Sequence, residues 1–339
     1  MSKRPYVNTI RDLLKGTNAL RTVSTLDKFT SLIHRISEDW QRKDWRDAEG
    51  DRDVLLNNVR LVGQAWFRGQ HTRELTLKPG LYRDSTRESL KKTKSSPIPA
   101  VSSKTLREEL FDLEHELRID FTSYDQLLND AGHVKSGLDW YFLMQHHGLP
   151  TRLLDWTTNA LAALFFALEA DSQDDGRSKK ASSVAVWMID AYWLAMCLSD
   201  DEWSGPLLSW SDDAEKYVPS LEVLLRNRAD SFTLIPEYAM PIEPPAIHPR
   251  VAAQEGRFII FGQTRDLLDH RLKTDGVRKL PRVRQIRFET DDVQSVLRDL
   301  AQLGVSRRTL FPDLDGLASF VRWKHFHRIS GYNLVLPGR

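Results

Sequence analysis

Apolar residues recur at helical spacing in several stretches of this chain. Residues 26–40, 106–121 and 291–303 each place an apolar side chain at every third or fourth position. This period of 3.6 residues is typical of an amphipathic helix with one buried stripe. Gly304 follows the third stretch at the position where a left-handed residue commonly ends a helix. We expect a helix in each stretch and a further helix over residues 313–320.

Shorter apolar runs fit strands. Residues 59–67 and 183–190 have the composition of buried strands, and residues 252–262 read as a strand with a bulge at Gly256. Residues 283–288 alternate loosely between apolar and polar and predict an edge strand. Because strands and helices are interleaved and hairpin-like stretches also occur, the pattern favours the α+β class.

The chain shows no internal repeat and no clear linker. We therefore expect one domain with added helices over residues 25–320. Two polar segments, residues 84–104 and 171–182, predict mobile insertions in it. Residues 1–24 then form an N-terminal extension and residues 321–339 a C-terminal tail.

Composition narrows the class of protein. The 339 residues include 48 basic and 47 acidic side chains, so the net charge of +1 gives no general attraction to nucleic acid or to an anionic membrane. Cys197 is the one cysteine, which excludes an internal disulfide and fits a reducing compartment. Its apolar neighbours predict a buried side chain. The longest apolar run, residues 160–168, is about half of what a membrane span requires. We expect a cytoplasmic protein without a membrane partner.

The densest group of reactive side chains lies in residues 145–159, with the sequence QHHGLPTRLLDWTTN. Gly148 and Pro150 predict a turn, because glycine accepts a positive φ and proline fixes φ. Residues 153–154 then predict a short buried strand. One of residues 157–159 can cap the apolar helix that follows. Such a segment can hold its histidine, arginine, aspartate and threonine side chains at the rim of a core.

Several familiar catalytic motifs are absent from the sequence. It contains no G-x-G-x-x-G, Walker lysine loop, H-E-x-x-H, C-x-x-C or G-x-S-x-G. His146 and His147 are adjacent, so on a strand they would face opposite ways and could not easily share one metal. Asp313 and Asp315 have the spacing of helix-capping and turn residues rather than of a cation site. We expect no metal.

Four segments, in chain order, carry a resemblance to a known family. They are Trp66–Gln70, Gln145–Thr157 with its ALFFA continuation, Ala253–Phe258 and Thr309–Leu317. Together they resemble the FRG-domain family, which is named for its Phe-Arg-Gly motif, over roughly residues 25–320.

The order of three of these segments is also similar to the three-part signature of the ADP-ribosyltransferase superfamily. This similarity implies a split mixed sheet and NAD as substrate. It implies that Arg68 meets the phosphate or ribose of NAD with its guanidinium fork. Gly69 would hydrogen-bond the nicotinamide carboxamide through its backbone. Thr157 would support either the nicotinamide ribose or the third segment. Further contacts to NAD are implied for Gln70, His146 and Arg152.

The third segment carries the implied catalytic step. Gln254 or Glu255 would hydrogen-bond a ribose hydroxyl as the glycosidic bond loosens. The segment departs from the superfamily pattern, since either Gly256 or a glutamine stands where the catalytic glutamate belongs. Strand alternation would also point Glu255 away from Gln254.

These features predict an enzyme that transfers ADP-ribose from NAD to a macromolecular acceptor, a protein or a nucleic acid, or that hydrolyses NAD. A toxin or an anti-phage defence component is the expected setting. One alternative is a non-catalytic module that recognises a nucleotide or phosphate. Another is a hydrolase or nuclease with His147 as general base and Asp155 orienting it. Structural roles compete at the same positions: Asp155 could pair with Arg68, or with Arg152 to clamp the turn.

Overall fold

The computed structural model describes the greater part of the chain. The described residues are 8–15, 20–48, 65–71, 76–83, 86, 88, 106–123, 137–173, 182–198, 216–220, 222–223, 234–244, 249–272 and 282–326. The predicted polar insertion at 84–104 lies outside them except for Thr86 and Glu88. Of the second predicted insertion at 171–182, residues 174–181 also lie outside them, whereas residues 171–173 end a helix and residue 182 begins a strand. Within the described residues, no helix is long and apolar enough to cross a membrane.

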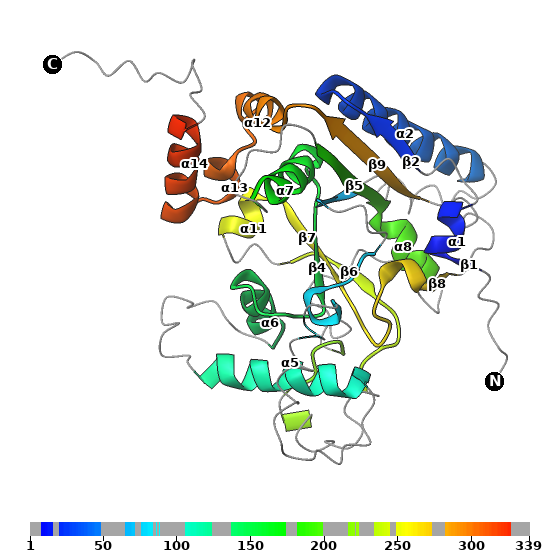
Figure 1. The fold of residues 1–339 in the computed structure, drawn as a ribbon. Helices are drawn as coiled ribbons and strands as arrows, with labels where there is room; N and C mark the ends of the chain where they lie inside the picture. The colour runs from blue at the N-terminus through cyan, green and yellow to red at the C-terminus, as the bar shows by residue number, and fades with distance from the viewer. Residues whose placement is uncertain are drawn as a thin grey trace.

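A seven-stranded mixed sheet forms the centre of the fold (Figure 1). In order across the sheet, its strands are β2 (Leu20–Val23), β9 (Val283–Thr290), β5 (Ser182–Asp190), β3 (Ala65–Gln70), β4 (Leu153–Thr157), β7 (Gly256–Ile260) and β6 (Met240–Ile242). β2 is parallel to β9, and the other neighbouring pairs are antiparallel. A short second sheet joins β1 (Asn8–Thr9) to β8 (Arg271–Leu272). The predicted α+β class is confirmed.

The sheet is divided between β3 and β4. These strands share a single residue pair, Phe67 with Thr157. In contrast, β3 pairs with β5 from Ala65 to Gln70, and β4 pairs with β7 from Leu153 to Thr157. The end of β3 that carries the Arg-Gly pair therefore has a partner strand on one side and an opening on the other.

Two hydrophobic cores lie on opposite faces of the sheet. One contains Trp66, together with side chains from α1 (Ile10–Lys15) and α8 (Ala191–Leu198). The other contains Phe67, together with side chains from α2 (Leu26–Ala48), α7 (Ala160–Gln173) and α12 (Val293–Gln302). The two aromatic rings point to different cores because successive strand residues face opposite ways, as the alternation predicts.

A third core fills the space between the β4–β7 half of the sheet and α6 (Gly137–His146). Leu153, Phe258 and Ile260 from the strands pack there against Tyr141 and Met144. α5 (Leu106–Ser123) runs beside α6 (Figure 1). The remaining helical elements are η1 (Gly80–Tyr82), α11 (Pro249–Ala253), η4 (Leu267–Asp269), α13 (Arg307–Leu310) and α14 (Leu314–Phe326).

Most elements with a strong pattern are confirmed. α2, α5, α12 and α14 correspond to the four predicted helices, and β5 to the predicted strand at 183–190. Of the strand predicted at 59–67, residues 59–64 lie outside the described residues, and residues 65–67 begin β3, which runs on to Gln70. Gly304 has φ +87°, as expected for a residue that ends a helix. In the central stretch, Asn159 caps α7, because its Oδ1 accepts hydrogen bonds from the backbone N–H of Leu161 and Ala162, both at 3.1 Å. Cys197 is buried, as predicted.

Two strand predictions are wrong in part. β9 is not an edge strand, because it lies between β5 and the four-residue β2, whose sequence LRTV is too short to show a period. The predicted strand at 252–262 begins at Gly256, which pairs in regular register with Thr157 rather than forming a bulge. Residues 252–253 belong to α11, which starts at Pro249, and residues 254–255 form a turn. Proline favours the first turn of a helix, so the run from Pro249 to Ala253 folds as one.

The sheet and its helices extend past the predicted domain limits. β2 lies within residues 1–24 and pairs with β9, and α14 continues to Phe326. The hydrophobic pattern also predicted no helix at α8, whose residues AYWLAMCL are apolar on every side. A short helix without a polar face has no amphipathic period to detect.

His270 is a buried histidine whose two nitrogens have fixed partners. Its Nε2 accepts a hydrogen bond from the backbone N–H of Ala239 at 2.9 Å. Its Nδ1 donates to the backbone carbonyl of Asp266, also at 2.9 Å, which fixes the neutral tautomer. Burial lowers the pKa of His270 from its ordinary value of 6.5 to about 4.

This depressed pKa makes the fold acid-sensitive. Between pH 6.5 and pH 4 the unfolded chain binds a proton that folded His270 excludes, so stability falls as the pH falls through this window. We expect a loss of about 3 kcal/mol of unfolding free energy from this residue. Urea unfolding at pH 7 and pH 4 measures it, with His270→Gln as the non-titrating control. An equal loss in both proteins would contradict the assignment.

Candidate functional site

A cavity of about 350 Å³ lies where β3 and β4 diverge. Its described lining residues are Phe67, Arg68, Gly69, Phe142, Gln145, His146, Asp155, Trp156, Thr157, Ala163, Phe166, Arg250, Val251, Gln254, Phe258 and Phe311. The volume falls within the range of roughly 300–1,000 Å³ typical of small-molecule sites. All four segments singled out in the sequence contribute to this one cavity, although they are far apart along the chain.

Arg68 brings a positive charge into the cavity. Its side chain is only 14% exposed, and burial lowers its pKa to about 10, so it remains charged at neutral pH. Its Nη1 donates to the backbone carbonyl of Asp155 at 2.6 Å and lies 3.8 Å from the Asp155 carboxylate. Its Nε finds no acceptor among the described residues. Arg68 therefore forms the ion pair with Asp155 that the structural alternative predicted. A desolvated guanidinium with an Nε donor still unused by the described residues nevertheless favours an anionic ligand.

Asp155 supplies the carboxylate among the described lining residues. The side chain is 54% exposed, so it reaches solvent and any bound molecule. Both carboxylate oxygens accept from Nε2 of Gln145, at 2.9 and 3.0 Å. The Oε1 of Gln145 accepts in turn from the hydroxyl of Thr151 at 2.5 Å. This chain of hydrogen bonds fixes the orientation of the carboxylate beside Arg68.

Thr157 connects the second and third segments. Its hydroxyl donates to the backbone carbonyl of Gln254 at 2.7 Å and accepts from the N–H of Asn159 at 2.9 Å. Two roles were implied for Thr157: support of the nicotinamide ribose or support of the third segment. The hydrogen bond to Gln254 provides the second. The Nε2 of Gln254 donates to the carbonyl of Leu310 at 3.1 Å, which ties this wall to α13.

Glu255 does not line the cavity. It occupies the turn before β7 with φ +48°, so strand alternation does not apply to it or to Gln254. Its carboxylate accepts from Thr158 Oγ1 at 2.9 Å and from Asn159 Nδ2 at 3.1 Å. These bonds direct the charge toward the start of α7. The catalytic role that the resemblance implied for this side chain has no support in its position.

Close packing of β3 against α7 requires a glycine at position 69. A Cβ atom there would lie 1.9 Å from the backbone carbonyl oxygen of Ala163 on α7. Only glycine lets β3 approach α7 so closely. Gly69 also lines the cavity, so its backbone remains near the site implied for the carboxamide contact.

We predict that Gly69→Ala destabilises the fold by about 3 kcal/mol, because the added methyl group must displace the helix backbone. Urea unfolding measures the change. Gly80→Ala is the matched control, since a Cβ there meets its nearest atom at 3.4 Å, an ordinary contact. Equal stability of Gly69→Ala and the natural protein would disprove the packing role.

Besides Glu255, three further predicted site residues lie away from the cavity. Gln70 has both ends of its amide engaged: Nε2 donates to the carbonyl of Thr76 and Oε1 accepts from the indole of Trp187, each at 2.8 Å. His147 is exposed in the turn after α6, with its ring 6.2 Å from that of Phe121. The third residue is Arg152. His146 does line the cavity, as predicted.

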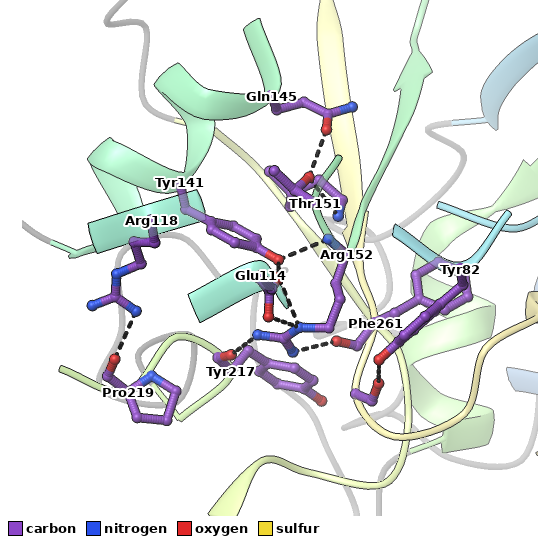
Figure 2. Close-up of polar contacts among 12 residues, drawn as sticks. Tyr82, Glu114, Arg118, Tyr141, Gln145, Thr151, Arg152, Tyr217, Pro219 and Phe261 are labelled. Carbon is purple, nitrogen blue, oxygen red and sulfur yellow. Dashed lines mark hydrogen bonds and ion pairs between the residues drawn. The ribbon is translucent and has the colours of Figure 1, made fainter. Parts of the chain in front are cut away.

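Arg152 is buried in a polar network behind β4 rather than in the cavity (Figure 2). Its Nε donates to Glu114 at 2.8 Å, Nη1 to the carbonyl of Phe261 at 2.7 Å and Nη2 to that of Tyr217 at 2.5 Å. Neither the predicted contact with NAD nor the predicted pair with Asp155 is present. Arg152 and Asp155 are three apart in extended chain, so their side chains face opposite ways.

Aromatic rings form much of the cavity wall, and the sequence analysis did not assign them to a site. Phe142 and Phe258 have ring centroids 5.0 Å apart, and Phe166 and Phe311 6.0 Å apart. Phe166 belongs to the ALFFA run and Phe311 to the FPDLDG run, so the resemblance contained this signal. From its helical spacing alone, however, Phe166 could equally have been a residue of the hydrophobic core.

A second arginine in the cavity lining comes from α11 and contacts the FPDLDG segment. Arg250 on α11 lies over the Phe311 ring, 5.0 Å from its centroid, and donates to Asp313 at 2.5 Å. The other oxygen of Asp313 accepts from the N–H of Gly316 at 2.7 Å, which confirms its predicted role in capping α14. No cluster of metal-ligating side chains occurs within the described part of the chain.

Comparison with known proteins identifies one domain. Residues 63–176 match the family model of the FRG domain. A search of the curated proteins and a search of the solved structures each found no match. The matched residues include β3, β4 and α7, so they supply Arg68, Asp155 and Thr157 to the cavity, whereas Gln254 comes from outside the match.

Proposed function

We propose that this FRG-domain protein binds NAD in the cavity between β3 and β4. It then transfers ADP-ribose to a protein or nucleic acid, or to water. The observation that carries the proposal is the meeting of Arg68, Thr157 and Gln254, from three distant segments, in one cavity of about 350 Å³. The division of the sheet at this place supports the ADP-ribosyltransferase likeness, in which the same three segments form the site.

Arg68 is the anion-binding group in this proposal. Its buried guanidinium offers directed N–H donors to the phosphates of NAD, and the low-dielectric surroundings strengthen that interaction. Phe142 and Phe166 present flat apolar surfaces that suit the nicotinamide or adenine ring. Arg250 would add a second cation if it exchanged Asp313 for a phosphate.

Asp155 takes the place of the carboxylate that the third segment lacks. In the reaction, the bond between ribose C1′ and the nicotinamide nitrogen breaks, and the nitrogen leaves with the electron pair. The C1′ carbon gains positive charge, which a nearby carboxylate stabilises. The acceptor oxygen or nitrogen bonds to C1′ and releases its proton to a base, a role that the exposed Asp155 can also fill. Gln145 keeps Asp155 in position.

The test is release of nicotinamide from NAD by the purified protein, with and without cell extract as a source of acceptors. We expect release in the natural protein and a loss of about 100-fold or more in Asp155→Asn. Asparagine has the size of aspartate but no charge, and its Oδ1 can still accept the hydrogen bond from Gln145. No release under any condition would overturn the enzymatic proposal. An active Asp155→Asn would overturn the role of this residue.

A non-catalytic nucleotide-binding module is the second candidate. It is favoured by Glu255, whose carboxylate is bound to Thr158 and Asn159 rather than turned to the cavity. Calorimetry separates the two functions: NAD binding that depends on Arg68 but yields no nicotinamide supports recognition alone. The hydrolase alternative receives no such support, because Gln145 rather than His147 contacts Asp155 in the described structure.

As a modifier of macromolecules, such an enzyme would suit a toxin or an anti-phage defence system. The natural acceptor decides between these settings. Mass spectrometry of cell extract incubated with isotope-labelled NAD would identify it.

A further inference from the structure

A second cavity lies at the far edge of the sheet, between α2 and the β2–β9 pair. Its volume is about 490 Å³, and its described lining residues are Arg21, Thr22, Val23, Leu32, Arg35, Ile36, Asp39 and Arg284. β2 is the edge strand opposite β6, and α2 lies alongside it (Figure 1). The two cavities share no lining residue, so this one is independent of the proposed NAD site.

Positive charge dominates this second cavity. Among the described residues that line it, three carry a guanidinium and Asp39 carries the carboxylate. Burial lowers the pKa of Arg284, Asp39 opposes that shift and Arg21 adds to it. Arg21 and Arg284 therefore lie close enough to influence one another, and Asp39 lies beside Arg284. Gathering like charges in a concave surface is unfavourable unless an anion balances them.

The arginines come from three separate elements. Arg21 lies on β2, Arg35 on α2 and Arg284 on β9, and β2 and β9 are held in parallel register. The Nη1 of Arg284 donates to the carbonyl of Val283 at 2.8 Å, and the Nε of Arg35 approaches the carbonyl of Ser31 at 3.4 Å. Both contacts restrain the positions of the guanidinium groups, each of which carries five N–H donors.

Apolar side chains line the same space. Val23 on the strand and Leu32 and Ile36 on the helix form a wall beside the charged groups. A bare inorganic anion would leave this wall in contact with water. A ligand with phosphate groups at one end and an apolar or heterocyclic body at the other would use both surfaces.

We infer that this cavity is a binding site for a small phosphorylated ligand, held by the guanidinium groups of Arg21, Arg35 and Arg284 and by the apolar wall of α2. The volume suits a molecule of nucleotide size rather than a macromolecule. Phosphate oxygens would take over the N–H donors, and Asp39 would compete with the ligand for the same arginines. β5 and β3 separate this site from the gap between β3 and β4, so the site can be occupied whether or not NAD is bound.

Isothermal titration with pyrophosphate and with ADP tests the inference. The titrations use the full chain, both as the natural protein and as Arg68→Ala, which removes binding at the first cavity. In Arg68→Ala we expect one site for each probe, with ADP bound more tightly because its adenosine covers the apolar wall. In the natural protein, an additional site belongs to the first cavity. No binding of either probe, or binding that disappears in Arg68→Ala, would overturn the inference.

Substitutions locate the site. Arg284→Gln and Arg35→Gln should each weaken pyrophosphate binding at least about tenfold. Arg287→Gln, three residues along β9 and outside the cavity lining, should leave it unchanged. Asp39→Asn removes the competing carboxylate and should tighten binding. Equal affinities in Arg284→Gln, Arg35→Gln and Arg287→Gln would contradict the site, as would weaker binding in Asp39→Asn.

Arg35 is exposed on α2 whereas Arg284 is partly buried, so Arg35→Gln tests the site with less effect on folding than Arg284→Gln. Thermal unfolding is measured for every variant before titration. A variant with the natural Tm and lost affinity supports the site. Natural affinity in a folded Arg35→Gln and a folded Arg284→Gln refutes it.

Discussion

Arg68→Ala is expected to lower kcat/KM for nicotinamide release from NAD by about 100-fold to 1,000-fold. The guanidinium is buried, and it carries its charge at neutral pH because its pKa is about 10. It lies at the opening of the sheet, where β3 has no partner beyond Phe67 on the β4 side. Removing it leaves the phosphates of NAD without their main donor in a desolvated cavity.

Arg68→Lys separates charge from geometry. Lysine keeps the positive charge but lacks the planar fork, so we expect it to recover part of the activity and to remain about tenfold below the natural protein. Arg298→Ala is the matched control, because Arg298 lies on α12 outside the cavity lining and is 35% exposed. Full activity in a folded Arg68→Ala variant would show that Arg68 does not take part in NAD binding or catalysis.

Arg152→Ala is expected to lower the free energy of unfolding by about 3–5 kcal/mol. The side chain is 2% exposed, and its loss leaves Glu114 as an uncompensated buried carboxylate. Burial already raises the pKa of Glu114, and Arg152 opposes that shift. The carbonyl oxygens of Phe261 and Tyr217 would also lose their donors. Urea unfolding measures the difference.

Removing both charges tests the origin of this loss. The double variant Glu114→Leu/Arg152→Met replaces the ion pair with apolar side chains of similar size and should be more stable than Arg152→Ala. NAD binding per folded molecule should be unchanged in it. A stable Arg152→Ala that no longer binds NAD would restore the ligand role predicted from the sequence.

The sequence predicted the elements whose pattern is local. The stripes of α2, α5 and α12, the buried strand β5 and a cap of α7 within residues 157–159 all follow from the spacing of neighbouring residues, and the structure identifies the capping residue as Asn159. α8 and β2 could not be predicted in the same way. One is apolar all round and the other is four residues long, so neither has a period.

The site was predicted only in part, because side-chain direction depends on contacts distant in sequence. Arg68, Thr157 and Gln254 meet in the cavity as expected. Arg152 looked like a ligand group beside Asp155, but its partner Glu114 is 38 residues earlier in the chain. Glu255 was placed on a strand, although a left-handed turn directs it to Thr158. Nothing local in the sequence encodes either partner.

The most direct test of the proposed function is calorimetric titration of NAD into variants of the three segments that line the cavity. Arg68→Ala, Thr157→Val and Gln254→Ala each change one segment, and Arg298→Ala serves as the control. We predict that all three weaken NAD binding while the control binds as the natural protein does. NAD binding that is absent from the natural protein, or unaffected by changes in two of the three segments, would contradict a shared NAD site.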